Sequence, residues 1–148
     1  MRKVKLLLLF LILLAATKIF SQNKTSVIND FVKAVFIEDK SAQFIADHYI
    51  YFQSIKNTKV SHTERMKFFE TLFLDFKNEN SESLKKSDFQ IVSYPDFKGE
   101  KIKFLHEPAD AYVIAQNNKA IFYVCLKENK IFSFTYITKG EWAFFLTY

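Results

Sequence analysis

The stretch AYVIAQ NN KAIFYVCLK EN KIFSFTYIT KG EWAFFLT, residues 111–147, decides the fold of this 148-residue chain. Its runs of aromatic and β-branched residues are typical of strands. The dipeptides between the runs contain Asn or Gly, which tolerate the positive φ of two-residue hairpin turns. The pattern predicts an antiparallel meander, with strands over about 111–116, 120–126, 131–137 and 142–147.

Two-residue turns at 117–118, 128–129 and 139–140 also predict the register of this meander. The predicted pairs are Tyr112 with Tyr123, Cys125 with Phe132, and Phe134 with Phe145. One face would then carry Tyr112, Ile114, Ile121, Tyr123, Phe132, Phe134, Tyr136 and Phe145. The other face would carry Val113, Phe122, Val124, Leu126, Ile131, Ser133, Thr135, Ile137, Trp142, Phe144 and Leu146.

Both faces of this predicted sheet are apolar. Antiparallel sheets commonly leave one face to water, so a second apolar face needs a cover of its own. We expect helices on one face. The other face needs a partner, a curved-over segment of the chain or a ligand.

Helices are predicted ahead of the meander. Apolar residues at helical spacing mark a helix over Val27–Phe36, and Ser26 is placed to cap its start. A short helix over Ser41–Asp47 is expected to lead into an extended stretch, Tyr49–Phe52.

A third helix is marked by a capping box, because Ser61 is followed three positions later by Glu64. Apolar side chains then recur on one face, at Met66, Phe69, Phe73 and Phe76. We expect a loop over Asn78–Ser87, and strands over Phe89–Val92 and Lys101–His106 before the meander. This order of elements predicts an α+β fold in a single domain, residues 22–148.

The first residues predict export. A cationic start, Met1–Lys5, precedes an apolar run, Leu6–Ala16, and the small residue Ser21, which is the pattern of a secretory signal peptide over residues 1–21. The run is shorter than the roughly 20 residues that cross a bilayer. The alternatives are an uncleaved anchor or a buried N-terminal helix. After cleavage the protein would be periplasmic or extracellular, without a membrane span.

The charge of the chain argues against a nucleic-acid partner. The whole chain has 21 Lys and Arg against 16 Asp and Glu, a net charge of +5. Arg2, Lys3, Lys5 and Lys18 belong to the predicted signal, which leaves 21 − 4 = 17 against 16, or +1. A near-neutral domain lacks the basic face that a phosphate backbone requires.

The sequence lacks the residue patterns that several classes of binding site and enzyme require. The two glycines, Gly99 and Gly140, cannot build a Gly-rich phosphate loop, a dinucleotide fingerprint or a nucleophile elbow. The three histidines show no zinc spacing with one another or with the sole cysteine. The sequence therefore predicts no cofactor and no metal.

We predict the surroundings of the three histidines and of the cysteine separately. His62 lies inside the capping box and His106 ends a predicted strand, whereas His48, at a helix-to-strand junction, is the one expected to reach a cavity. Cys125 lies in a strand among apolar residues and is expected to be buried and inert.

The helices over Val27–Phe36, Ser41–Asp47 and Ser61–Phe76, followed by strands to Tyr148, resemble the NTF2-like (cystatin-like α+β) superfamily. The resemblance covers nearly the whole chain after residue 21 and lies in element order and length. It implies a sheet curled around a helix as a cone with an apolar pocket. Members include isomerases, dehydratases, ligand binders and dimerising accessory domains. No catalytic residue is carried over from it.

The predicted function is a non-enzymatic exported module that binds a small apolar ligand or associates with itself through the sheet. Tyrosine combines an apolar ring with a hydroxyl that seeks a partner when buried, which makes the sheet tyrosines candidates. The candidate ligand-binding or interface residues are Tyr112, Tyr123, Phe132, Phe134, Tyr136 and His48. The alternative is a cofactor-independent pocket enzyme of the isomerase, dehydratase or hydrolase type, which would use a histidine and a carboxylate. A structural or inhibitory partner of an envelope protein is the third possibility.

Overall fold

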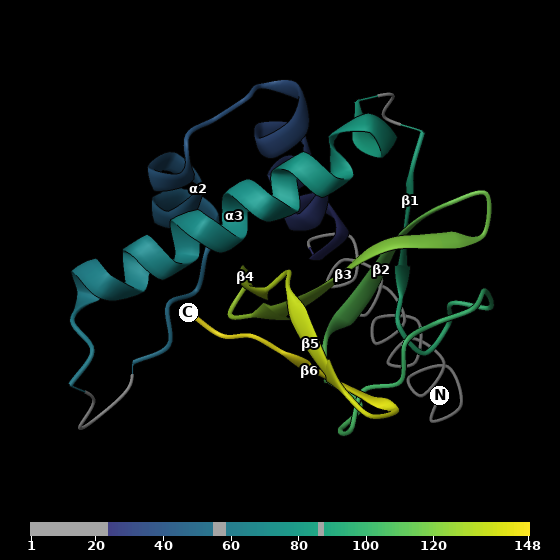
Figure 1. Ribbon diagram of the computed structural model, residues 1–148. Coiled ribbons are helices and arrows are strands. Elements are labelled where there is room, and N and C mark those ends of the chain that lie inside the picture. The colour runs from purple at the N-terminus through teal and green to yellow at the C-terminus, as the bar shows by residue number, and fades with distance from the viewer. Residues whose placement is uncertain (1–23, 55–58, 86–87) are drawn as a thin grey trace, which may run out of the picture.

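The computed structural model describes residues 24–54, 59–85 and 88–148, so the predicted signal peptide lies outside the described residues. The fold is α+β, as predicted: three N-terminal helices, a four-stranded antiparallel meander and a separate two-stranded hairpin (Figure 1). Within the described part, no helix combines the length and apolarity that crossing a bilayer requires.

The first helix covers residues 24–32 and continues into a π-helical turn, η1 (Lys33–Ile37). Its inward stripe is the predicted one, since Ile28, Phe31 and Val32 are fully buried. The predicted N-cap is wrong, because Ser26 lies inside the helix rather than at its start.

The second helix, α2 (Ala42–Tyr49), begins where it was predicted. The hydroxyl of Ser41 accepts the main-chain N–H of Phe44 at 3.2 Å. This bond satisfies one of the N–H groups that the first turn of a helix leaves without a partner. Ile50 follows α2 in extended conformation and forms a bridge with Ile131 of the sheet.

The third helix, α3 (His62–Leu84), has the predicted capping box. Ser61 Oγ accepts the Glu64 N–H at 3.2 Å, and the Glu64 carboxylate accepts the Ser61 N–H at 2.7 Å. The loop predicted from Asn78 is wrong as far as Leu84, while residues 86–87 lie outside the described part. The extra turns form because Leu84 is fully buried and anchors the end of the helix.

The meander consists of β1 (Gln90–Ser93), β2 (Ala111–Gln116), β3 (Lys119–Lys127) and β4 (Lys130–Ser133), in that spatial order. A second sheet holds only β5 (Tyr136–Lys139) and β6 (Trp142–Phe145). The single strand predicted over 131–137 is wrong, because the chain bends at Phe134 and Thr135 and divides into β4 and β5. The strand predicted over 101–106 is also wrong, since that segment is a loop with one bridge, Phe104 to Ala143.

Two of the predicted turns are confirmed, but the predicted register beyond them is wrong. The residues at 117–118 and 128–129 have positive φ, and the strands pair as predicted beside each turn. A register shift then follows in each hairpin, so that Tyr112 pairs with Val124 and Cys125 pairs with Ser133. Each shift adds one residue to one strand, as a β-bulge does. The sequence between the turns carries no signal for this extra residue.

The third turn is displaced by one residue from its prediction. Gly140 has positive φ, and the turn residues are Gly140 and Glu141, between the paired residues Lys139 and Trp142. Phe145 therefore pairs with Tyr136, two residues from the predicted partner Phe134. A slip of two residues keeps each side chain on the same face.

The helices cover one face of the meander (Figure 1). Aromatic rings fill the space between them: the centroids of Phe76 and Phe134 are 4.6 Å apart, and those of Phe69 and Tyr148 are 5.2 Å apart. Because of the first bulge, Phe122 and Val124 share this core with Tyr112 and Ile114. Phe122 and Val124 were predicted on the opposite face from these two residues.

The chain itself covers the second face of the meander. Tyr94, Phe97, Phe104 and Ala143 pack there against Val113, Ala115 and Tyr123. The ring of Phe104 stacks on that of Phe145, with centroids 4.4 Å apart. Of the three covers considered for the second face, the structure therefore contains the curved-over segment, residues 94–104, together with the β5–β6 hairpin.

Phe134→Ala is expected to lower the free energy of unfolding by about 3–5 kcal/mol, because it removes a ring that contacts four others and leaves a cavity. Phe68→Ala is the matched control, since that side chain is 49% exposed, and a change within about 0.5 kcal/mol is expected. Urea denaturation measures both. Equal effects of the two substitutions would contradict the packing described.

Tyr148 is expected to make the fold sensitive to alkaline pH. Burial raises the pKa of its phenol to about 12, against the ordinary 10.0. The neutral phenol therefore contributes its full stabilisation at pH values below the ordinary pKa. This stabilisation is lost as the pH rises through the pKa of Tyr148 in the folded protein. Denaturation between pH 9 and 12 should show a steeper loss of stability in the natural chain than in Tyr148→Phe. Parallel pH profiles would contradict this expectation.

Candidate functional site

The two sheets separate where the chain leaves β3. Strand β4 pairs only with Cys125–Lys127 of β3, after which Phe134 and Thr135 bend away and β5 pairs with β6. A gap therefore opens between the first half of β3, residues 119–123, and β5 (Figure 1).

Ser133 holds this bend. Its side chain is fully buried, and its hydroxyl lies within hydrogen-bonding distance of the Thr135 carbonyl, at 2.9 Å, and of the Leu146 carbonyl. On the helix side of the bend, Phe134 is inserted among the core rings. The bend is thus tied on both sides of the chain, and the gap is a fixed feature of the fold.

Three adjoining hollows follow the gap, and we call them together the cleft. The largest, of about 750 Å³, lies between the 100–103 loop, the β2–β3 turn and the β5–β6 hairpin. The second, of about 390 Å³, lies between α3 and β5, and the third, of about 470 Å³, lies between α3 and the β2–β3 turn. Ile121 lines all three hollows.

The floor of the largest hollow is apolar and aromatic. It consists of Ile102, Ala120, Ile121, Tyr123 and Tyr136. The rings of Tyr123 and Tyr136 meet edge to face, with centroids 5.9 Å apart. The hollow thus offers a floor for an apolar group and a rim for a polar one, because charged side chains surround it: Glu100, Lys101, Lys103, Lys119 and Glu141.

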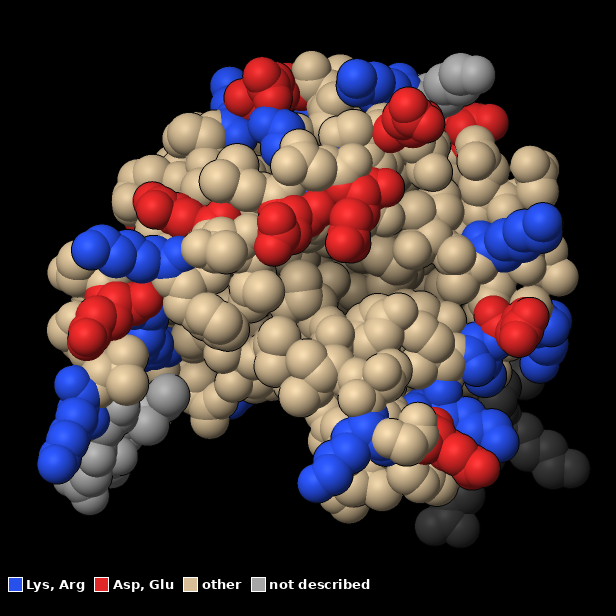
Figure 2. Space-filling model, viewed as in Figure 1, with Lys and Arg blue, Asp and Glu red and all other residues tan. Residues whose placement is uncertain are grey.

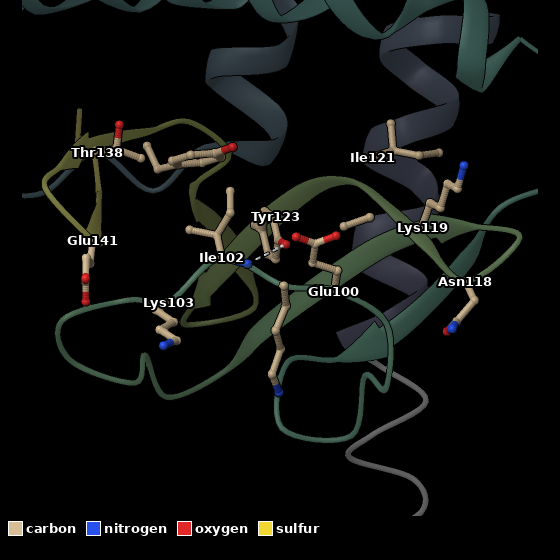
Figure 3. Close-up of a pocket in the computed structure, with 12 residues that line it drawn as sticks. Glu100, Ile102, Lys103, Asn118, Lys119, Ile121, Tyr123, Thr138 and Glu141 are labelled. Atoms are coloured by element: carbon tan, nitrogen blue, oxygen red, sulfur yellow. Dashed lines mark hydrogen bonds between the residues drawn. The ribbon is translucent and has the colours of Figure 1, made fainter.

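Tyr123 ties the 100–103 loop to the sheet. Its hydroxyl accepts the main-chain N–H of Ile102 at 3.0 Å, and the Tyr94 hydroxyl donates to the Ile102 carbonyl at 2.6 Å. In Figure 3 the Glu100 carboxylate is directed toward the Tyr123 hydroxyl. The loop therefore lies against the sheet as a wall of the hollow.

The phenols of the hollow remain neutral at physiological pH. Burial raises the pKa of Tyr123, the hydrogen bond from the Ile102 N–H lowers it by less, and nearby groups that include Glu100 add smaller increases. Burial also raises the pKa of Tyr136, with a contribution from Glu79 across the gap. Both hydroxyls are therefore hydrogen-bonding groups rather than phenolate nucleophiles or bases.

The predicted site residues do not lie together. Tyr123, Tyr136 and Phe134 line the cleft, and Phe134 also belongs to the helix-side core. Tyr112 is buried on the helix side of β2. Phe132 lines a separate apolar hollow of about 250 Å³ near the end of β6.

Neither His48, the histidine predicted to reach a cavity, nor His106 lies in the cleft. His48 is exposed at the end of α2, where its ring stacks on Phe44 at 4.0 Å and its Nδ1 lies 2.9 Å from the Phe44 carbonyl. His106 is exposed and borders the small hollow of Phe132. We therefore leave His48 out of the site.

Ile102, Ile121 and Glu100 were missed from the sequence. Ile102 comes from the segment predicted as a strand, 101–106, and Glu100 directly precedes that segment, so no register placed either residue. Ile121 reaches the cleft because the bulge turns β3 at that point. A bulge has no sequence signature here, and only the paired strands reveal it.

The described residues include no cluster of three or more histidine, cysteine, aspartate or glutamate side chains suited to a metal. Cys125 is buried, and burial raises the pKa of its thiol to about 11. A thiol in that state is a poor nucleophile at neutral pH. No family model matches the chain, and the comparisons with curated proteins and with solved structures give no match either.

Tyr123→Phe is expected to lower the free energy of unfolding by about 1–3 kcal/mol, because the N–H of Ile102 then loses its acceptor. Amide hydrogen exchange at Ile102 should accelerate. Tyr51→Phe is the control, since its hydroxyl makes only a 3.4 Å contact to Glu128. Unchanged exchange at Ile102 would show that the hydroxyl does not hold the loop.

Proposed function

We propose that this protein is a non-enzymatic binding module and that the cleft around Ile121, Tyr123 and Tyr136 is its binding site. The observation that supports the proposal most is the construction of the cleft. An apolar floor between rigid walls, with a charged rim, is the usual build of a ligand site.

Two binding modes were predicted for such a module, and binding of a ligand has more support than self-association through the sheet. Association through a whole sheet face has little support, because helices cover one face and residues 94–104 with the β5–β6 hairpin cover the other. A site in a cone between sheet and helix, as in the NTF2-like resemblance, also has little support. Aromatic rings fill that space. The cleft lies at the border of the two sheets and is open.

A second candidate function is a cofactor-independent enzyme. The observation that favours it is the Glu100 carboxylate directed at the Tyr123 hydroxyl (Figure 3), because a carboxylate can act as a general base. The raised pKa of Tyr123 limits this pair, since the phenol holds its proton at neutral pH. A histidine lies neither in the cleft nor beside a carboxylate in the other hollows described, so the predicted histidine–carboxylate pair has no support.

The proposed site is expected to bind 1-anilinonaphthalene-8-sulfonate, whose rings suit the floor and whose sulfonate suits the lysines of the rim. Ile121→Glu should weaken binding of the dye at least fivefold, because it places a charge where the three hollows meet. Thr138→Trp, which fills the largest hollow from the hairpin side, should do the same. Fluorescence titration of the full chain measures the affinity.

Leu74→Glu is the matched control, because Leu74 is 54% exposed on α3 and lines none of the three hollows. It should leave dye binding unchanged. Thermal melting checks that all variants are folded. If the cleft variants bind the dye as well as the natural chain does, the cleft is not the site.

A further inference from the structure

We infer that the ligand of the cleft is an extended peptide, which adds as a strand between β3 and β5. This inference rests on the proposed function and names the class of partner. It starts from the main-chain groups along the gap rather than from the side chains of the floor.

The main chain of β3 presents one open edge to the gap. The N–H of Leu126 donates to the Asp110 carbonyl on the β2 side at 3.0 Å. The N–H and C=O groups of successive residues point alternately to the two edges of a strand. Counting back from Leu126, the main-chain groups of Val124 also point to β2, and those of Tyr123 point away from β2. Among the described residues, no strand pairs with β3 on that side before Cys125.

The main chain of β5 presents the opposing edge. The N–H of Leu146 donates to the Thr135 carbonyl at 2.9 Å, so the main-chain groups of Thr135 point to the β6 side. By the same alternation, those of Tyr136 and Thr138 point away from β6 and toward β3. Two strand edges thus face each other across the cleft.

Two other edges of these sheets are covered. The N–H of Tyr51 donates to the Ile131 carbonyl at the outer edge of β4, at 2.8 Å. At the outer edge of β6, the N–H of Ala143 donates to the Lys103 carbonyl at 2.8 Å. Proteins usually protect such edges because an open one pairs with other chains. The facing edges of β3 and β5 have no such cover in the described part of the chain.

The length of the β3 edge and the charges of the cleft suit a short strand. Residues 119–123 of β3 span about 17 Å, at roughly 3.3 Å per residue, which is the length of about five residues of an added strand, and the bulge at Ile121 interrupts regular pairing in the middle of this stretch. Successive side chains of that strand would point alternately to the hollow between α3 and β5 and to the largest hollow, which is lined by Tyr123 and Tyr136.

The hollow between α3 and β5 is apolar below a rim that carries Asp75 and Glu79, both exposed. Figure 2 shows acidic side chains along α3 above a hollowed surface. We therefore assign basic side chains to the positions that face α3 and apolar side chains to the positions that face the largest hollow, whose floor is apolar.

The probe is a pool of acetylated and amidated heptapeptides in which lysine alternates with valine or isoleucine, added to the full isotope-labelled chain. Binding should slow amide hydrogen exchange at Tyr123, Tyr136 and Thr138 at least tenfold, because these N–H groups gain acceptors. Exchange at Val124, which already points to β2, should hardly change. Unchanged exchange at the three gap residues in the bound state would overturn the inference.

Two matched comparisons test the main-chain and charge contributions. The same peptides with alternate amides N-methylated keep their side chains and lose half of their donors, and should bind at least tenfold more weakly. Glu79→Gln should weaken binding of the lysine peptides severalfold, whereas Glu70→Gln, on α3 away from the three hollows, should not. Equal binding of the methylated peptides would overturn strand addition.

The remaining outcomes separate this inference from the proposed function. If the peptide pool does not bind up to millimolar concentration while the dye binds in an Ile121-dependent manner, the peptide assignment is overturned and the cleft is a site for small molecules. If neither the dye nor the peptides bind at the cleft, both proposals fail.

Discussion

The whole architecture depends on one constraint: the four-stranded meander is apolar on both faces, and both must be removed from water. Helices cover only one face. The chain covers the other face by bending at Phe134 and Thr135, so that β5 and β6 pack on that face beside residues 94–104. Burial of apolar surface drives both coverings, since each buried aromatic side chain is worth roughly 1.5–3 kcal/mol.

The bend that covers the second face also creates the cleft. A strand that continued straight from β4 would have paired with β3 over the rest of its length. Instead Ser133 holds the bend through main-chain carbonyls, and Phe134 anchors it in the helix-side core. The gap between β3 and β5 is therefore a direct consequence of how the core is completed. Its walls are rigid because each belongs to a packed cluster.

The chemistry of the cleft favours recognition over catalysis. Its tyrosines are held protonated by burial, and the buried thiol of Cys125 lies in a different part of the molecule. What the cleft offers instead is an aromatic floor, a rim of both charges and two strand edges. These are the contacts that sequence-tolerant peptide binding uses, because main-chain bonds provide affinity and alternate pockets provide selectivity.

Short patterns in the sequence were enough to predict those structural elements that depend only on neighbouring residues. The capping box at Ser61, the start of the second helix near Ser41 and the turn asparagines were all readable, because each depends on residues within four positions of one another. The two apolar faces were also readable, although the assignment of side chains to them was wrong beyond the first bulge. Three of the six predicted site residues, Tyr123, Tyr136 and Phe134, line the cleft. Only the tertiary structure decided the bulges, the bend at Phe134 and the place of Ile102, because these depend on packing between residues far apart in the chain. The signal peptide predicted over residues 1–21 lies outside the described residues and stays a prediction.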